Sequence, residues 1–149
     1  YEFLSDPIKA LLDGLTAIHD GSQAWTAGYG VKPDPGKTYP QTEHPVVATH
    51  PRTERKFLYV NASFTTHIVQ LTRKESDAIL HLLARHVESQ LALQTRVRWT
   101  PNALVIWDNW ASQHHAVWDY YPEERWGDRV SVVTGEAPRA RIELSAAAE

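Results

Sequence analysis

The first hydrophobic pattern in the chain repeats every three to four residues and predicts an amphipathic helix near the N-terminus. Apolar residues follow this spacing at Ile8, Leu11, Leu12 and Leu15. We expect Asp6 to cap the helix, because Pro7 after it suits the first helical position, where no backbone N–H is needed. His19 is then expected at the exit of this helix, near its terminal carbonyl groups.

A second helix is predicted from a sequence signature at its start. Residues 72–75 (TRKE) form a capping box, in which a threonine and a glutamate each bind a free backbone N–H of the first turn. The predicted helix runs from Lys74 to about Glu88. Its apolar face consists of Ile79, Leu82, Leu83 and Val87.

The remaining hydrophobic runs are short and predict strands. They occupy residues 45–49, 57–60, 95–99, 104–107 and 130–133. Residues 20–43 are rich in glycine, proline and polar side chains, so we expect a long loop that serves as a binding lid. The chain is therefore predicted to be mainly β with flanking helices. Periodicity alone leaves both a sandwich and a jelly roll open.

Composition narrows the class of protein. A chain of 149 residues fits one domain, and 42% hydrophobic residues favour a folded core. The net charge of −3 gives no electrostatic basis for nucleic-acid binding, and no apolar run is long enough to span a membrane. The absence of cysteine excludes disulfides and thiolate metal sites, in keeping with an expected cytoplasmic location. With no methionine at its start, the chain is expected to be part of a longer protein.

One stretch carries candidate chemistry. His114 follows the predicted strand 104–107, and Arg125 and Arg129 follow His114 by 11 and 15 residues. A histidine ring nitrogen can bind a metal ion, and a guanidinium can hold a carboxylate or a sulfonate with two parallel hydrogen bonds. The spacing alone leaves a purely structural histidine open.

Several ordered blocks of the sequence resemble one enzyme family. They are residues 1–5 (YEFLS), 44–51 (HPVVATHP), 58–69 (LYVNASFTTHIV) and 107–114 (WDNWASQH). Together they resemble the TauD/TfdA family of taurine dioxygenases, from Tyr1 to about Pro138, and are closer to its fungal-type members.

The resemblance implies a fold and a reaction. The fold is a double-stranded β-helix, a jelly roll with flanking helices, of which this chain is part. Family members hold Fe(II) with two histidines and one carboxylate, which leaves positions open for 2-oxoglutarate and O₂. The implied reaction is hydroxylation of a small anionic substrate such as taurine, another sulfonate or a sulfate ester.

The resemblance also implies roles for individual residues. His114 corresponds to the third iron ligand. Arg125 corresponds to the arginine that pairs with the far carboxylate of 2-oxoglutarate, a task suited to a bidentate guanidinium. Arg129 corresponds to the arginine that faces the anionic head of the substrate. Phe64 and Trp25 correspond to aromatic residues beside the substrate.

Some positions depart from the family pattern. The family's first two iron ligands form a His-x-Asp pair, and no such pair occurs in this sequence. Residues 1–149 are therefore expected to be the C-terminal part of a single dioxygenase domain, with the pair lying before Tyr1. Trp110 and His115 stand where the family has Arg and Tyr.

Two alternative functions stay open. The chain could be a catalytically incomplete half-barrel that acts as a binding or interaction domain. It could also be a half-enzyme completed by another chain, including a second copy in a homo-oligomer.

Overall fold

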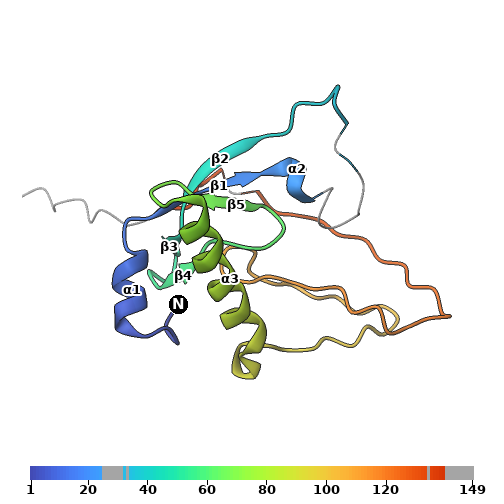
Figure 1. The fold of residues 1–149 in the computed structure, drawn as a ribbon. Coiled ribbons are helices and arrows are strands. Elements are labelled where there is room, and N and C mark those ends of the chain that lie inside the picture. Colours follow the sequence, from blue (N-terminus) through green and yellow to red (C-terminus); the bar gives the residue numbers. More distant parts are fainter. Residues whose placement is uncertain (25–31, 33, 134, 140–149) are drawn as a thin grey trace, which may run out of the picture.

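The computed structural model describes residues 1–24, 32, 34–133 and 135–139. Two small antiparallel sheets lie beside one long helix, and an extended segment projects away from them (Figure 1). In chain order the elements are α1 (Asp6–Leu12), β1 (Thr16–Asp20), α2 (Gly21–Gln23), β2 (Gln41–Pro45), β3 (Val47–Thr49), β4 (Lys56–Leu58), β5 (Thr65–Ile68), α3 (Arg73–Ser89) and the 3-10 turn η2 (Leu91–Leu93).

The two sheets interleave along the chain, because β5 follows the hairpin β3–β4 in sequence and joins β1 and β2 in the first sheet. The first sheet has the order β2-β1-β5, and β1 pairs with β2 in the register Ala17 opposite His44. A register shift between Ile18 and His19 interrupts the pairing of β1 with β5. The second sheet is the hairpin β3–β4, with Ala48 opposite Phe57. The predicted strand 45–49 is thus divided between the end of β2 and β3, and the predicted strand 57–60 overlaps β4.

Both predicted helices are present. In α3 the capping box is complete: the backbone N–H of Thr72 donates to the Glu75 carboxylate at 2.9 Å, and the backbone N–H of Glu75 donates to Thr72 Oγ1 at 3.5 Å. In α1 the expected cap was wrong by one residue. Ser5 occupies the N-cap with extended backbone, and Asp6 lies within the first turn, where its carboxylate is 3.4 Å from Lys9 Nζ.

The segment after α1 is a strand, so the predicted helix exit at His19 was wrong. Gly14 adopts a left-handed backbone (φ 77°) and turns the chain out of the helix. Ala17, in β1, is then fully buried opposite Ile68 of β5. The predicted loop 20–43 is regular at both ends, because Asp20 belongs to β1, residues 21–23 to α2, and residues 41–43 to β2.

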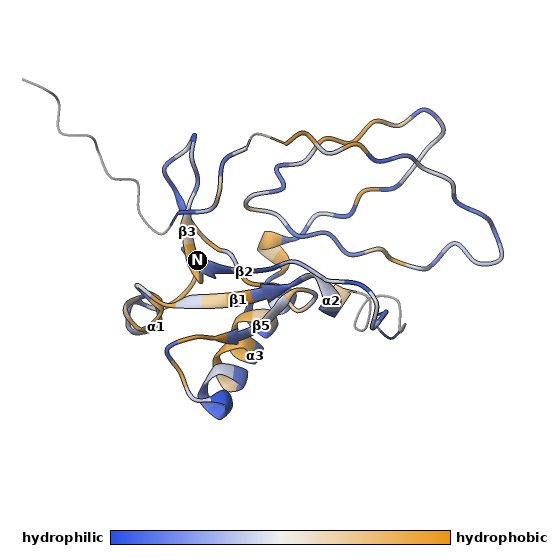
Figure 2. Ribbon diagram, turned by 90° about the horizontal axis from the view of Figure 1, so that it is seen from above, coloured by the Kyte–Doolittle hydropathy of each residue, from blue (hydrophilic) through white to orange (hydrophobic). Residues whose placement is uncertain are grey.

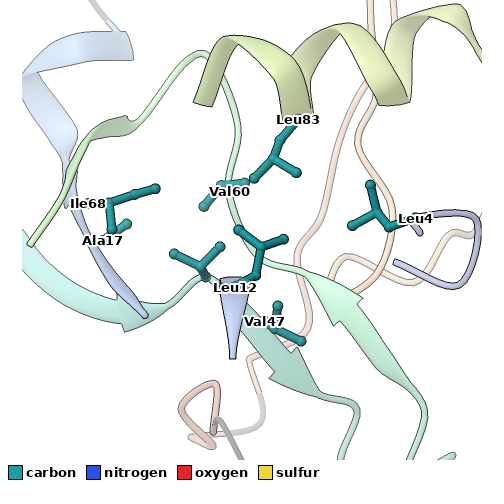
Figure 3. Packing of buried hydrophobic residues seen from close by; sticks show 8 residues of the cluster. Leu4, Leu12, Ala17, Val47, Val60, Ile68 and Leu83 are labelled. Atoms are coloured by element: carbon teal, nitrogen blue, oxygen red, sulfur yellow. The ribbon is translucent and has the colours of Figure 1, made fainter. Parts of the chain in front are cut away.

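A small hydrophobic core joins the helices to both sheets. Its buried members are Leu4, Leu12, Ala17, Val46, Val47, Val60, Ile68 and Leu83. Figure 3 shows Leu83 of α3 directed toward Val60 and Leu12, and Ala17 beside Ile68. These side chains come from both sheets and from the helices α1 and α3, so burying them fixes the hairpin β3–β4 relative to the first sheet.

Residues 94–133 contain no regular strand in the part of the chain that the structure describes, so the predicted strands 95–99, 104–107 and 130–133 were wrong. The segment is extended, but over its described residues it forms no backbone ladder with a neighbouring strand, which a β-strand requires. Figure 2 shows hydrophobic residues along its projecting loops, and Val132 is 91% exposed. Among the described residues, no helix is long and apolar enough to cross a membrane.

Candidate functional site

The part of the extended segment that precedes His114 lies against the hairpin β3–β4. His50 directly follows β3, and its side chain is only 12% exposed. The backbone N–H groups of Arg52 and Thr53 donate to His50 Nδ1 at 3.2 and 3.1 Å. His50 Nε2 lies 2.9 Å from Asp108 Oδ2. The turn between β3 and β4 therefore holds the His50 ring in an orientation that contacts residue 108.

Asp108 organises the turn that leads toward His114. Its second carboxylate oxygen accepts the backbone N–H of Trp110 at 2.8 Å, and its backbone carbonyl accepts the hydroxyl of Ser112. An aspartate that accepts the N–H two residues later forms an Asx turn, a local alternative to regular secondary structure. The indole of Trp110 lies edge-on to the His50 ring, with centroids 6.5 Å apart.

The turn has a second attachment next to His114. The side-chain amide of Gln113 donates to the backbone carbonyl of Val60 at 2.9 Å. His114 itself is exposed, and its ring lies 5.5 Å from the ring of Trp107. The structure thus brings residues 107–114 together with residues 50 and 60, which belong to two other blocks of the sequence motif.

The other predicted site residues are not gathered around His114. The Arg125 guanidinium lies over the Tyr120 ring, 4.8 Å from its centroid. Arg129 is exposed, and Phe64 is 42% exposed at a turn where its N–H donates to Asn61. Trp25 lies outside the described residues.

Metal binding needs more donors than this arrangement supplies. Within the described ranges, no three histidine, cysteine, aspartate or glutamate side chains are grouped closely enough to hold a metal ion. The exposed imidazole of His114 is chemically suited to one position of a site with nitrogen and oxygen ligands. These residues therefore fit one part of an iron site and do not complete one.

A second cluster, of His19, His44 and Tyr59, lies outside the site residues predicted from the sequence. The ring of His19 stacks on Tyr59 with centroids 5.4 Å apart, and the His44 ring is edge-on to both, at 5.1 Å from His19 and 5.3 Å from Tyr59. Burial lowers the pKa of His19, and the neighbouring His44 lowers it further, against a hydrogen bond with the Tyr59 backbone. Burial also lowers the pKa of His44 and raises that of Tyr59.

The pairing of β1 with β2 explains this cluster. His19 is opposite Thr42, two residues from His44 on the same face of the sheet. Only a correct assignment of residues 16–20 as a strand, with its register, would have revealed it.

Comparison with known proteins places the chain in a family. Residues 1–131 match the model of the taurine catabolism dioxygenase TauD, TfdA family. An alpha-ketoglutarate-dependent sulfonate dioxygenase of Saccharomyces cerevisiae is 39% identical over 124 residues, which cover 80% of this chain and 29% of the yeast protein. A Schizosaccharomyces pombe protein assigned to the same class is 38% identical over 142 residues, which cover 93% of this chain and 35% of the length of the S. pombe protein.

A solved structure supports the same placement. The crystal structure of a taurine dioxygenase from Burkholderia xenovorans superposes with a TM-score of 0.53 and 36% identity, over 67% of this chain and 30% of that one. The match confirms the predicted fold class, part of a jelly roll with flanking helices. The chain spans about a third of the length of the two fungal relatives. The chain belongs to the TauD/TfdA family of taurine catabolism dioxygenases.

Proposed function

We propose that the protein of which these residues are part is an Fe(II)- and 2-oxoglutarate-dependent dioxygenase that hydroxylates a small sulfonate or sulfate ester. The observation that carries the proposal is the turn 107–114, which ends in His114 and is attached to the hairpin β3–β4 at two points. The family match and the sulfonate dioxygenase names of the fungal relatives support the substrate class. The net reaction consumes O₂ and 2-oxoglutarate and yields hydroxylated substrate, succinate and CO₂.

Each predicted site residue has a role in this proposal. His114 supplies one metal ligand, and residues outside these 149 supply the other two. Bound iron supplies the activation of O₂. Arg125 pairs with the far carboxylate of 2-oxoglutarate, and Arg129 pairs with the anionic head of the substrate. Phe64 and Trp25 contact the apolar part of the substrate. Residues 20–43 form a lid over the substrate.

Succinate release tests the proposal. The intact protein is incubated with Fe(II), 2-oxoglutarate and, in turn, taurine, longer alkanesulfonates and alkyl sulfate esters. We expect substrate-dependent succinate from at least one class, and at least a hundredfold loss in His114→Ala. The matched control is His115→Ala, which removes the neighbouring exposed imidazole. Absence of succinate with every substrate would contradict the dioxygenase assignment.

A second candidate function is a catalytically incomplete half-barrel that binds a ligand or partner. It is favoured by the lack of a three-ligand group among the described residues. It predicts that Fe(II) with 2-oxoglutarate, added without oxygen, leaves the melting temperature of the intact protein unchanged. A rise in melting temperature would favour the dioxygenase.

A further inference from the structure

We propose that His50 and Asp108 are positioning residues that together fix His114 in place for metal binding. This inference rests on the proposed function, because a fixed orientation of the His114 ring matters only if the ring binds a metal ion. The two residues are 58 positions apart in the sequence and neither is a candidate ligand. Their contact at 2.9 Å joins the turn of the β3–β4 hairpin to the start of the turn 107–114.

The hydrogen bonds around His50 determine its tautomer. Because Nδ1 accepts N–H groups from both Arg52 and Thr53, that nitrogen carries no proton. The ring proton of the neutral imidazole is then on Nε2, which donates to Asp108 Oδ2. Hydrogen bonds to a carboxylate are shorter and stronger than bonds between neutral groups. The hairpin turn thus presents a donor in a fixed direction.

Asp108 uses both carboxylate oxygens. One accepts from His50, and the other accepts the backbone N–H of Trp110. The same carboxylate therefore attaches the turn to the hairpin and sets the backbone direction that leads to His114. An asparagine at this position has one oxygen and one NH₂ group, so it would face one of the two donors with hydrogens.

The attachments lie at opposite ends of the hairpin. His50 is at the turn end, where its backbone N–H donates to Arg55, while Val60 follows Tyr59, whose N–H donates to Val46 at the other end. Gln113 contacts Val60, so the turn 108–113 is held at both of its ends along the hairpin. His114 is the next residue, so the attachment at Gln113 also fixes where its backbone lies.

Aromatic rings shield the contact. Phe57 and Trp110 lie with their ring centroids 6.3 and 6.5 Å from that of His50, and the His50 side chain is 12% exposed while Asp108 remains 48% exposed. Partial burial limits competition from water and strengthens the hydrogen bond. The indole of Trp110 lies on one side of this contact.

Binding of Mn(II) alone to the intact, anaerobic protein tests the inference, measured from the electron paramagnetic resonance signal of the free ion. We expect Asp108→Asn and His50→Gln each to weaken binding about tenfold, the lower end of the effect for groups that orient metal ligands. The double variant should bind about as weakly as the weaker single variant, because both changes disturb the same attachment of the turn 107–114 to the hairpin. The matched control is Asp119→Asn, which removes an exposed carboxylate paired with Arg96 in the same extended segment.

A second measurement separates positioning from general stability. In the metal-free protein, amide hydrogen exchange should become faster in residues 107–114 of Asp108→Asn and stay unchanged in α3. Wild-type binding with equal affinity in both single variants would overturn the positioning role and leave the proposed function intact. Additive losses in the double variant, or faster exchange throughout the protein, would also overturn it. A wild-type protein that binds no Mn(II) would instead overturn the proposed function.

Discussion

At the scale of single residues, Ser76 links α3 to the first sheet. Its hydroxyl accepts the backbone N–H of Ile68 at 2.8 Å, and both residues are fully buried. Ser76→Ala leaves this N–H without a partner, so we expect a loss of about 1–3 kcal/mol in the free energy of unfolding. Urea denaturation measures the loss. Ser89→Ala, at the exposed end of α3, should change stability by less than about 0.5 kcal/mol. Equal effects would contradict this role.

The pair His19 and His44 predicts a dependence of stability on pH. The pKa of both rings is lowered in the folded protein, mainly by burial, so the unfolded chain binds protons more readily. Stability is then complete above about pH 6.5, the pKa of a free histidine, and is lost as the pH falls through and below that value.

Urea denaturation at pH 7.5 and pH 5.5 measures this dependence. We expect the unfolding midpoint to be lower at pH 5.5, and the difference to be smaller in His44→Gln, which also relieves the repulsion on His19. His81→Gln, on the exposed face of α3, is the control and should keep the wild-type difference. An unchanged difference in His44→Gln would show that the cluster is not the source.

At the scale of elements, the capping box should determine how stable α3 is at its start. Thr72→Ala removes the acceptor for the Glu75 N–H and also a hydroxyl that donates to the Glu75 carboxylate at 2.7 Å. We expect a loss of about 1 kcal/mol in unfolding free energy. Denaturation followed by far-ultraviolet circular dichroism measures it. Thr72→Ser keeps the hydroxyl and should retain most of the stability, and equal losses in both variants would refute the capping contribution.

The helices were predictable from the sequence because their signals are local. The capping box at 72–75 and the apolar spacing of α3 lie within the helix they specify. Strands depend on partners elsewhere in the chain. Residues 95–99 have the alternation of a strand and no ladder, while β1 was missed because the turn at Gly14 and its pairing with β2 and β5 decide its conformation.

The same distinction applies to the candidate site. His114 could be singled out from its motif, as could Arg125 and Arg129. The contact of Asp108 with His50 could not, because it depends on how a hairpin and a turn 58 residues apart meet. The Gln113 bond to Val60 is equally non-local. Roles for the two arginines and Phe64 stay predictions, since the structure brings none of them into contact with His114.

At the scale of the whole molecule, the most unusual feature is the exposed apolar side chains of the extended segment. Within residues 94–133 the largest exposures belong to Leu104, Ile106, Trp118, Tyr121, Trp126, Val130, Val132 and Val133. These residues follow one another along backbone with few internal hydrogen bonds among the described residues. Extended apolar segments with unpaired N–H and C=O groups are sites of association.

The 149-residue chain on its own should therefore associate through this segment. We expect light scattering to report species larger than a monomer at micromolar concentration. Val130→Lys with Val132→Lys places two charges on side chains that are 89% and 91% exposed, and should shift the distribution toward monomer. The control adds the same charge at exposed polar positions of the segment, Thr95→Lys with Thr100→Lys, and should leave association nearly unchanged. A wild-type chain that stays monomeric would contradict the prediction. Equal solubilisation by both pairs would attribute the effect to net charge instead of the apolar surface.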